Sequence, residues 1–141
     1  MPNKLHWTKN LKLDDDTYEG MINIDDTESI IYVEIDKEQK DDDMKIAFCN
    51  EIINWYEENS KKVKSFASNK LLELKNTHWV ESDTDVVTED EFITKIKLES
   101  IAIHKDKSIT FFFKDGNLFL GHCIMVGMNK NCALEYAEIA G

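Results

Sequence analysis

IIYVEID, residues 30–36, and MKIAFCNEIINWY, residues 44–56, contain the change of pattern that decides the fold. In the first stretch apolar residues occupy every second position, which is the period of a strand with one buried face. In the second they recur at three- and four-residue steps, the period of an amphipathic helix, as Met44, Phe48, Ile52, Trp55 and Tyr56 do. The chain therefore combines strands with helices, and we expect an α+β fold.

The N-terminal third predicts three strands, at residues 7–13, 18–24 and 30–36. Acidic residues at 14–16 and 25–26 separate them and are typical of turns. Because the connections are this short, the simplest arrangement is an antiparallel meander.

The helical pattern begins after three carboxylates, Asp41 to Asp43, which suit the N-terminus of a helix. A second helical stretch carries Val63, Phe66, Ala67, Leu71 and Leu74. We interpret Asn59 and Ser60 as a break between two helices. One long bent helix is the alternative.

In the C-terminal part, residues 79–90 are strongly acidic and show no period, which predicts an exposed connection that ends at Thr88. The spacing from Thr88 to Glu91 resembles a capping box, so a short helical turn is expected there. Four strands follow, with Asp115-Gly116 as a hairpin turn; they span residues 96–104, 109–114, 117–126 and 132–139.

Together these patterns predict one domain over residues 1–141. It has an N-terminal meander, two central helices packed on one face, and a C-terminal four-stranded antiparallel meander. Whether the two groups of strands share one sheet is left open.

Charge restricts the possible partners. The chain has 17 basic and 28 acidic residues and a formal net charge of −11. That charge repels nucleic acid and anionic lipid, and it favours encounter with a basic protein. The alternative interpretation is that acidity serves solubility alone. We therefore expect a protein partner, and neither nucleic acid nor membrane.

The compartment follows from missing signals. Residues 1–10 contain no apolar segment of the kind that a secretory signal needs, and no stretch approaches the length of a membrane span. The three cysteines, Cys49, Cys123 and Cys132, form no CxxC pair. A cytoplasmic protein with reduced thiols is expected.

Catalytic signatures are sparse. His122 and Cys123 are adjacent, and neighbours in a strand point to opposite faces, so joint metal binding is not expected. His104 could face His122 across a sheet, but nothing fixes further ligands. Cys123 lies in an apolar run that favours a buried thiol. We assign no catalytic residue, metal or cofactor, and keep as the alternative a small hydrolase using His122 with Cys123 or a carboxylate.

Two features suggest surfaces. Phe111 and Phe113 should share one face of a strand, with Phe112 on the other, where it is either buried or part of an exposed partner surface. The extended row of carboxylates between residues 81 and 91 is the best candidate for contact with a basic partner. Its members are Glu81, Asp83, Asp85, Glu89, Asp90 and Glu91.

The last quarter of the chain carries a resemblance. It contains FFFKDGNLFLGH at residues 111–122 and ends in AEIAG at residues 137–141. The chain resembles the bacterial domain of unknown function family 2262 in this stretch. The distinctive part is the succession of aspartate-glycine, an aromatic residue and glycine-histidine. Leu120 stands where that resemblance leads us to expect an aromatic residue, often tryptophan. The resemblance implies a bacterial source and a small α+β fold, and it marks Gly121 and His122 as possible functional residues, with a structural role as the other interpretation.

By analogy of size and style, such domains are similar to immunity proteins, which neutralise a partner toxin. The leading hypothesis is therefore an immunity protein that blocks a toxin sterically and electrostatically. Besides the small hydrolase, a regulatory or scaffold domain is a second alternative to the immunity protein.

Overall fold

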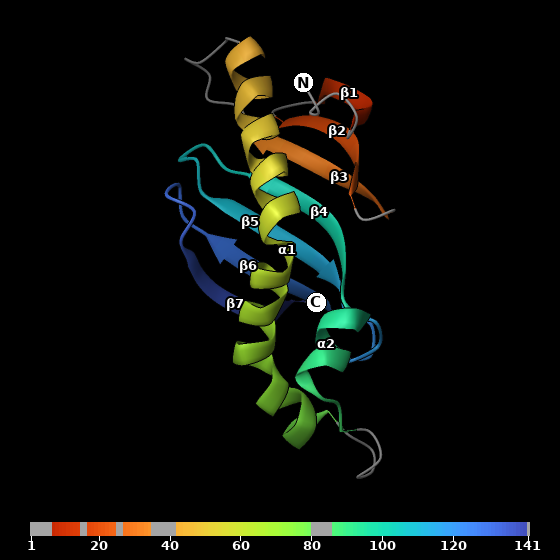
Figure 1. The fold of residues 1–141 in the computed structure, drawn as a ribbon. Coiled ribbons are helices and arrows are strands. Elements are labelled where there is room, and N and C mark those ends of the chain that lie inside the picture. Colours follow the sequence, from red (N-terminus) through yellow and green to blue (C-terminus); the bar gives the residue numbers. More distant parts are fainter. Residues whose placement is uncertain (1–6, 15–16, 25–26, 35–41, 80–85, 141) are drawn as a thin grey trace.

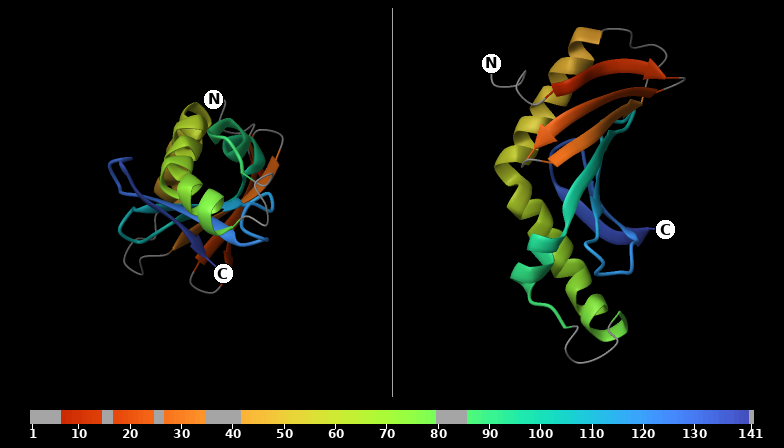
Figure 2. Two further views of the ribbon diagram at one scale, coloured as in Figure 1. Left: turned by 90° about the horizontal axis from the view of Figure 1, so that it is seen from below. Right: turned by 90° about the vertical axis from the view of Figure 1, so that its right-hand side faces the viewer.

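The computed structural model describes residues 7–14, 17–24, 27–34, 42–79 and 86–140. Within them, seven strands form a single sheet in the order β1-β2-β3-β4-β5-β6-β7. Two helices lie on one side of this sheet (Figures 1 and 2). The chain is thus α+β, as the change of period predicts, and the two groups of strands do share one sheet.

The first three strands are β1 (Trp7–Asp14), β2 (Thr17–Ile24) and β3 (Thr27–Glu34). They form the predicted antiparallel meander. β3 then pairs in parallel with β4 (Lys97–Ile103), so the helices form the crossover connection that a parallel pair requires. This single parallel pair joins the two meanders.

The C-terminal meander contains β4, β5 (Ile109–Lys114), β6 (Cys123–Met128) and β7 (Leu134–Ala140), all antiparallel. The prediction of four strands is therefore right in number and order. The third and fourth begin later than predicted, because residues 117–122 and 132–133 lie in turns.

α1 (Asp42–His78) is one continuous helix of 37 residues, about 55 Å long at 1.5 Å per residue. The division into two helices is wrong, and the alternative of a single long helix is right. Asn59 does not cap a new helix: its side-chain amide donates to the carbonyl oxygen of Trp55, 2.8 Å away and one turn earlier. Ser60 lies on the same stripe as the buried Tyr56 and Val63, so the apolar seam continues past it.

α2 (Glu89–Lys95) begins at the predicted capping box. Thr88 accepts a hydrogen bond from the backbone N–H of Glu91, and Glu91 accepts one from the N–H of Thr88. Asn76 of α1 holds the segment before α2, since its side-chain amide both donates to and accepts from the backbone of Val87, at 3.0 and 2.9 Å. These bonds tie α2 to the C-terminal end of α1.

The core lies between α1 and the sheet. Phe111 and Phe113 are fully buried there, and the ring centroid of Phe111 lies 5.2 Å from that of Tyr56 and 6.2 Å from that of Trp55. Burying side chains of this size contributes about 1.5–3 kcal/mol each. One face of the sheet is therefore committed to the core.

Candidate functional site

The opposite face of the sheet is not covered by α1 or α2, as Figure 2 shows in both views. Strand pairing assigns residues to this face, because residues directly opposite each other across a ladder project to the same side. We call it the open face and define it by two rows that run across the strands. The first row is Met21, Ile30, Ser100, Phe112, Met125 and Glu138. The second is Glu19, Tyr32, Ala102, Thr110, Gly127 and Tyr136.

The open face is aromatic and rich in methionine, and it is only partly shielded. Tyr32, Phe112 and Met125 are half-buried, and Tyr136 is 40% exposed. Of the two alternatives for Phe112, burial is the wrong one. The helices pack on the other face, and the N-terminal meander belongs to the same sheet, so neither covers this side chain. Aromatic residues and methionine are the types enriched in protein–protein interfaces.

Carboxylates lie beside these aromatic side chains. Glu19 is directly opposite Tyr32, and Glu99 lies at the register shift between Leu98 and Ser100. The pKa of Tyr32 is raised, first by burial and then by the negative charges of Glu19 and Glu99. The lysines of this face, in contrast, lie on β1 and at the end where β4 pairs with β5; they are Lys9, Lys12, Lys97 and Lys114.

A polar cluster lies at one end of the open face. The His104 ring bridges two strands: Nδ1 donates to Oε1 of Glu34, and Nε2 lies 2.8 Å from Oγ1 of Thr110. Thr110 is buried and sits inside β5, so its hydroxyl is held in the sheet rather than presented in a cleft. Glu34, His104 and Thr110 stand in the order carboxylate, imidazole, hydroxyl, which is that of a nucleophilic triad. Here their hydrogen bonds link β3, the end of β4 and β5.

The loop between β5 and β6 lies at the other end, and it replaces residues 117–122 of the strand predicted over residues 117–126. Asp115 is buried, and its carboxylate accepts backbone hydrogen bonds from Asn117, Phe119 and Gly121 at 2.8–3.0 Å. Positive φ angles bend the chain around it, at Gly116, Asn117, Leu120 and Gly121. The family motif around aspartate-glycine thus builds a loop centred on one carboxylate.

Gly121 and His122 both belong to this loop. Gly121 has φ of +90°, which favours glycine, and its N–H donates to Asp115. Nδ1 of His122 donates to the carbonyl oxygen of Phe119, and the ring lies edge-on to Trp79 with centroids 5.2 Å apart. Leu120, at the position expected to be aromatic, is 73% exposed.

His122 and Cys123 line one hollow of about 430 Å³, together with Glu99 and Asp115. The expectation that they project to opposite faces of a strand is wrong, since His122 precedes β6 and only Cys123 lies in it. The pKa of the Cys123 thiol is raised by burial and by Glu99 and Asp115, and its Sγ lies 3.7 Å from the carbonyl oxygen of Ile124. A raised pKa keeps this thiol protonated, which opposes a nucleophilic role.

His104 and His122 do not face each other. His104 follows the end of β4 near Ile109, whereas His122 lies beside the opposite end of β5. Among the described residues, no group of three or more histidine, cysteine or acidic side chains could hold a metal ion.

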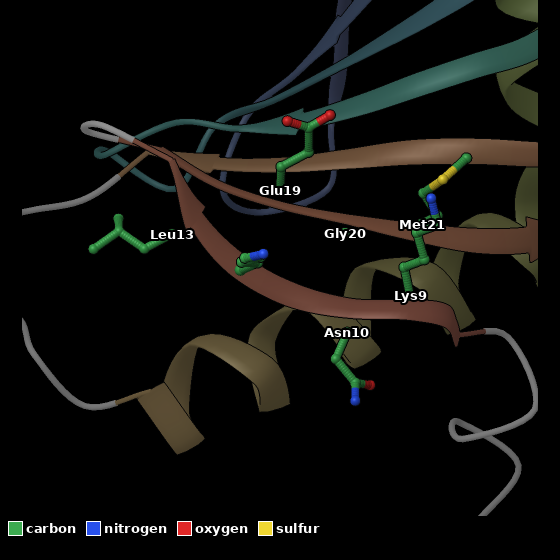
Figure 3. Close-up of a pocket in the computed structure, with 7 residues that line it drawn as sticks. Lys9, Asn10, Leu13, Glu19, Gly20 and Met21 are labelled. Atoms are coloured by element: carbon green, nitrogen blue, oxygen red, sulfur yellow. The ribbon is translucent and has the colours of Figure 1, made fainter.

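A second hollow, also of about 430 Å³, lies on the outer edge of the sheet between β1 and β2. In Figure 3, Lys9 reaches toward Met21, and Glu19 and Asn10 project to opposite sides of the two strands. This hollow joins the β2 end of the open face, and it carries both basic and acidic groups.

The acidic segment lies elsewhere. Glu89, Asp90 and Glu91 form the exposed first turn of α2, on the same side of the sheet as α1 (Figure 2). Glu81, Asp83 and Asp85 lie outside the described residues. Glu91 serves the capping box, which leaves Glu89 and Asp90 to project from the turn.

Sequence reasoning missed most of the open face. Tyr32, Glu99, Met125 and Tyr136 were not predicted as surface residues, although the alternation in β3 and β5 already separates two sets of side chains.

No helix in the described part of the chain is long and apolar enough to cross a membrane.

Over the residues that the structure describes, fold and surface define an α+β domain in which a single helical layer leaves one face of a seven-stranded sheet open. A family model described as uncharacterized protein conserved in bacteria (DUF2262) matches residues 8–139, and the chain belongs to this bacterial family. The resemblance seen in the last quarter of the sequence was therefore too narrow, because the match spans nearly the whole chain. No curated protein and no solved structure matches it.

Proposed function

We propose that this chain is a non-catalytic protein-binding domain whose open face contacts a basic partner protein. The observation that carries the proposal is the open face, which no described helix covers and which presents partly exposed aromatic and methionine side chains. These side chains are Met21, Tyr32, Phe112, Met125 and Tyr136. Central aromatic residues surrounded by polar ones match the organisation of protein interfaces.

A basic partner is favoured by charge. The chain carries −11, and carboxylates from four strands border the aromatic centre. These carboxylates are Glu19, Glu34, Glu99 and Glu138. A partner with an apolar centre and basic rim would satisfy both features.

The specific form that we propose is an immunity protein, which neutralises a bacterial toxin by steric and electrostatic blockade. Support comes from the acidic charge, the open face and the analogy of size with such proteins. On this view, the acidic turn of α2 attracts the toxin at long range, and the open face holds it.

The test is co-expression with the product of the gene immediately upstream, followed by copurification and by a growth assay for protection. Tyr32→Ala and Phe112→Ala should each weaken binding by about tenfold or more, mainly through faster dissociation. Leu120→Ala removes an exposed apolar side chain outside the open face and should leave binding unchanged. Without a complex and without protection the immunity proposal fails, whereas a complex without protection supports the regulatory or scaffold alternative.

The carboxylates between residues 81 and 91 are tested separately. Charge reversal at Asp83, Asp85 and Glu89 should slow association and flatten its dependence on salt, with little change in dissociation. Unchanged kinetics would remove this segment from recognition. A faster dissociation would instead make it part of the contact surface.

A hydrolase remains the second candidate because Glu99, His122 and Cys123 line a common hollow. Its histidine already donates through Nδ1, and its thiol has a raised pKa, so binding is the function that the geometry favours. Hydrolysis of activated esters by the purified chain, abolished by both His122→Ala and Cys123→Ala, would reverse this preference.

A further inference from the structure

The two edges of the sheet differ in how they are protected. β1 forms one edge and β7 the other. The pairing of β1 with β2 is interrupted by two register shifts, and β1 carries Lys9 and Lys12. Irregular pairing and lysines are the devices by which proteins prevent an edge strand from pairing with another chain.

β7 has fewer of these devices: its pairing with β6 has one register shift, between Gly127 and Met128 at its N-terminal end, and it carries no lysine. From Cys123↔Ala140 to Gly127↔Tyr136 it pairs with β6 at five consecutive positions without a shift. Its sequence, LEYAEIA, contains neither proline nor lysine, and each of its residues is half-buried or exposed. Among the described residues no strand lies beyond it, so one side of its backbone is available for pairing.

The charge of β7 indicates what could pair with it. Glu138 projects onto the open face beside Met125, and Glu135 lies at the register shift, where its carboxylate accepts a hydrogen bond from Asn129. A strand added to β7 would therefore lie beside two carboxylates, one of them on the open face. Two copies of this chain would bring −11 against −11, which disfavours self-association.

We propose that β7 is the edge at which the partner adds an extended, basic strand and so lengthens the sheet. Backbone hydrogen bonds would provide the affinity, and in a strand of alternating basic and apolar residues the basic side chains would meet Glu138 on the open face. This inference rests on the proposed function, because it states how the partner of the open face is held.

The direct test uses the full chain, labelled with ¹⁵N, and a short synthetic peptide of alternating lysine and valine. With the peptide at about ten times its dissociation constant, outward amides of β7 should exchange with solvent about tenfold more slowly. Amides of β1 should be unaffected. Protection of β1 instead, of neither edge, or a peptide-independent dimer through β7 would overturn the proposal.

Two controls separate edge pairing from attraction between charges. The same peptide N-methylated at every backbone amide keeps its charge but cannot donate, so it should give no protection. The variant Glu135→Lys/Glu138→Lys should lose about tenfold or more in peptide affinity. Glu51→Lys/Glu73→Lys makes the same change in net charge at exposed positions of α1 and should lose much less. Equal losses in the two variants would contradict the proposal.

The outcomes also distinguish this inference from the proposed function. If the product of the upstream gene binds through Tyr32 and Phe112 while the β7 amides remain unprotected, the edge inference fails alone. If the peptide protects β7 but the gene product neither binds nor is neutralised, the proposed function fails and the edge stands.

Discussion

The two faces of the sheet come from the same strands but have different side chains. Toward α1 the strands place Ile31, Ile101, Phe111 and Val126, all fully buried. Toward the other side the same strands place tyrosine, threonine, methionine and glutamate, most of them half-buried. The difference teaches that a covered and an open position are separated by one residue along the chain, so neighbouring substitutions should have different consequences for stability.

The largest expected effect contrasts two adjacent phenylalanines. Phe111→Ala should destabilise the fold by about 3–5 kcal/mol, because it removes a fully buried ring from beneath Tyr56 and Trp55. Phe112→Ala should cost about 1 kcal/mol, since its ring already meets solvent. Urea unfolding followed by circular dichroism measures both. Similar losses for the two variants would mean that the open face is as much a core as the covered one.

The second effect is steric and lies on the open face. A Cβ added at Gly127 would come within 2.0 Å of the Tyr136 ring, which lies over this glycine from β7. Gly127→Ala should therefore destabilise by about 1–3 kcal/mol, and a second substitution, Tyr136→Ala, should restore part of the loss. Tyr136→Ala alone is the control. Strictly additive losses in the double variant would show that the ring does not press on this position.

Alternation of apolar residues was enough to predict the N-terminal meander and the order of the last four strands, and the spacing from Thr88 to Glu91 was enough to predict the capping box. These features depend on local spacing, which the sequence displays directly. Asn59 and Ser60 misled the helix prediction because both are polar at one point of a long helix. Whether such residues break a helix depends on the apolar seam on either side of them and on hydrogen bonds such as that from Asn59 to Trp55.

The site was harder to predict for a related reason. Phe112 is buried or open depending on whether a helix covers one face or both, which is a property of the whole fold. The loop around Asp115 was read as a strand because Leu118 and Phe119 are apolar, yet both are buried in a turn that one carboxylate organises. No local pattern reports three backbone N–H groups converging on one side chain.

The third effect compares two thiols. Cys49 is fully buried in α1, and burial raises its pKa to about 12, whereas Cys123 is half-buried at the edge of the open face and its pKa is raised less. Iodoacetamide near pH 8 should modify Cys123 slowly and Cys49 only after unfolding. Peptide mass spectrometry measures both rates, with Cys123→Ser as the control for assignment. Fast modification of Cys49 in the folded chain would show that α1 separates from the sheet.

The same thiol links stability to pH. Between the ordinary cysteine pKa of 9.0 and about 12, the unfolded chain has lost the Cys49 proton while the folded chain retains it. The folded state then binds more protons, so the contribution of this group to stability should fall as pH rises through that window. Cys49→Ala should reduce the slope of unfolding free energy against pH above 9. An unchanged slope would indicate that the folded chain ionises this thiol readily.

The smallest effect concerns Tyr32, at the centre of the open face. Its pKa is raised mostly by burial, and Glu19 and Glu99 add to the rise because a nearby negative charge disfavours the phenolate. Glu99→Gln should therefore lower the Tyr32 pKa, but by less than burial raises it. Nuclear magnetic resonance of ring-labelled tyrosine, recorded as pH is raised, measures the change. Glu138→Gln removes another carboxylate from the same face and serves as the matched control. If it lowers the pKa as much as Glu99→Gln does, the charges act on Tyr32 as a diffuse field, and the specific place of Glu99 at the register shift of β4 loses its significance.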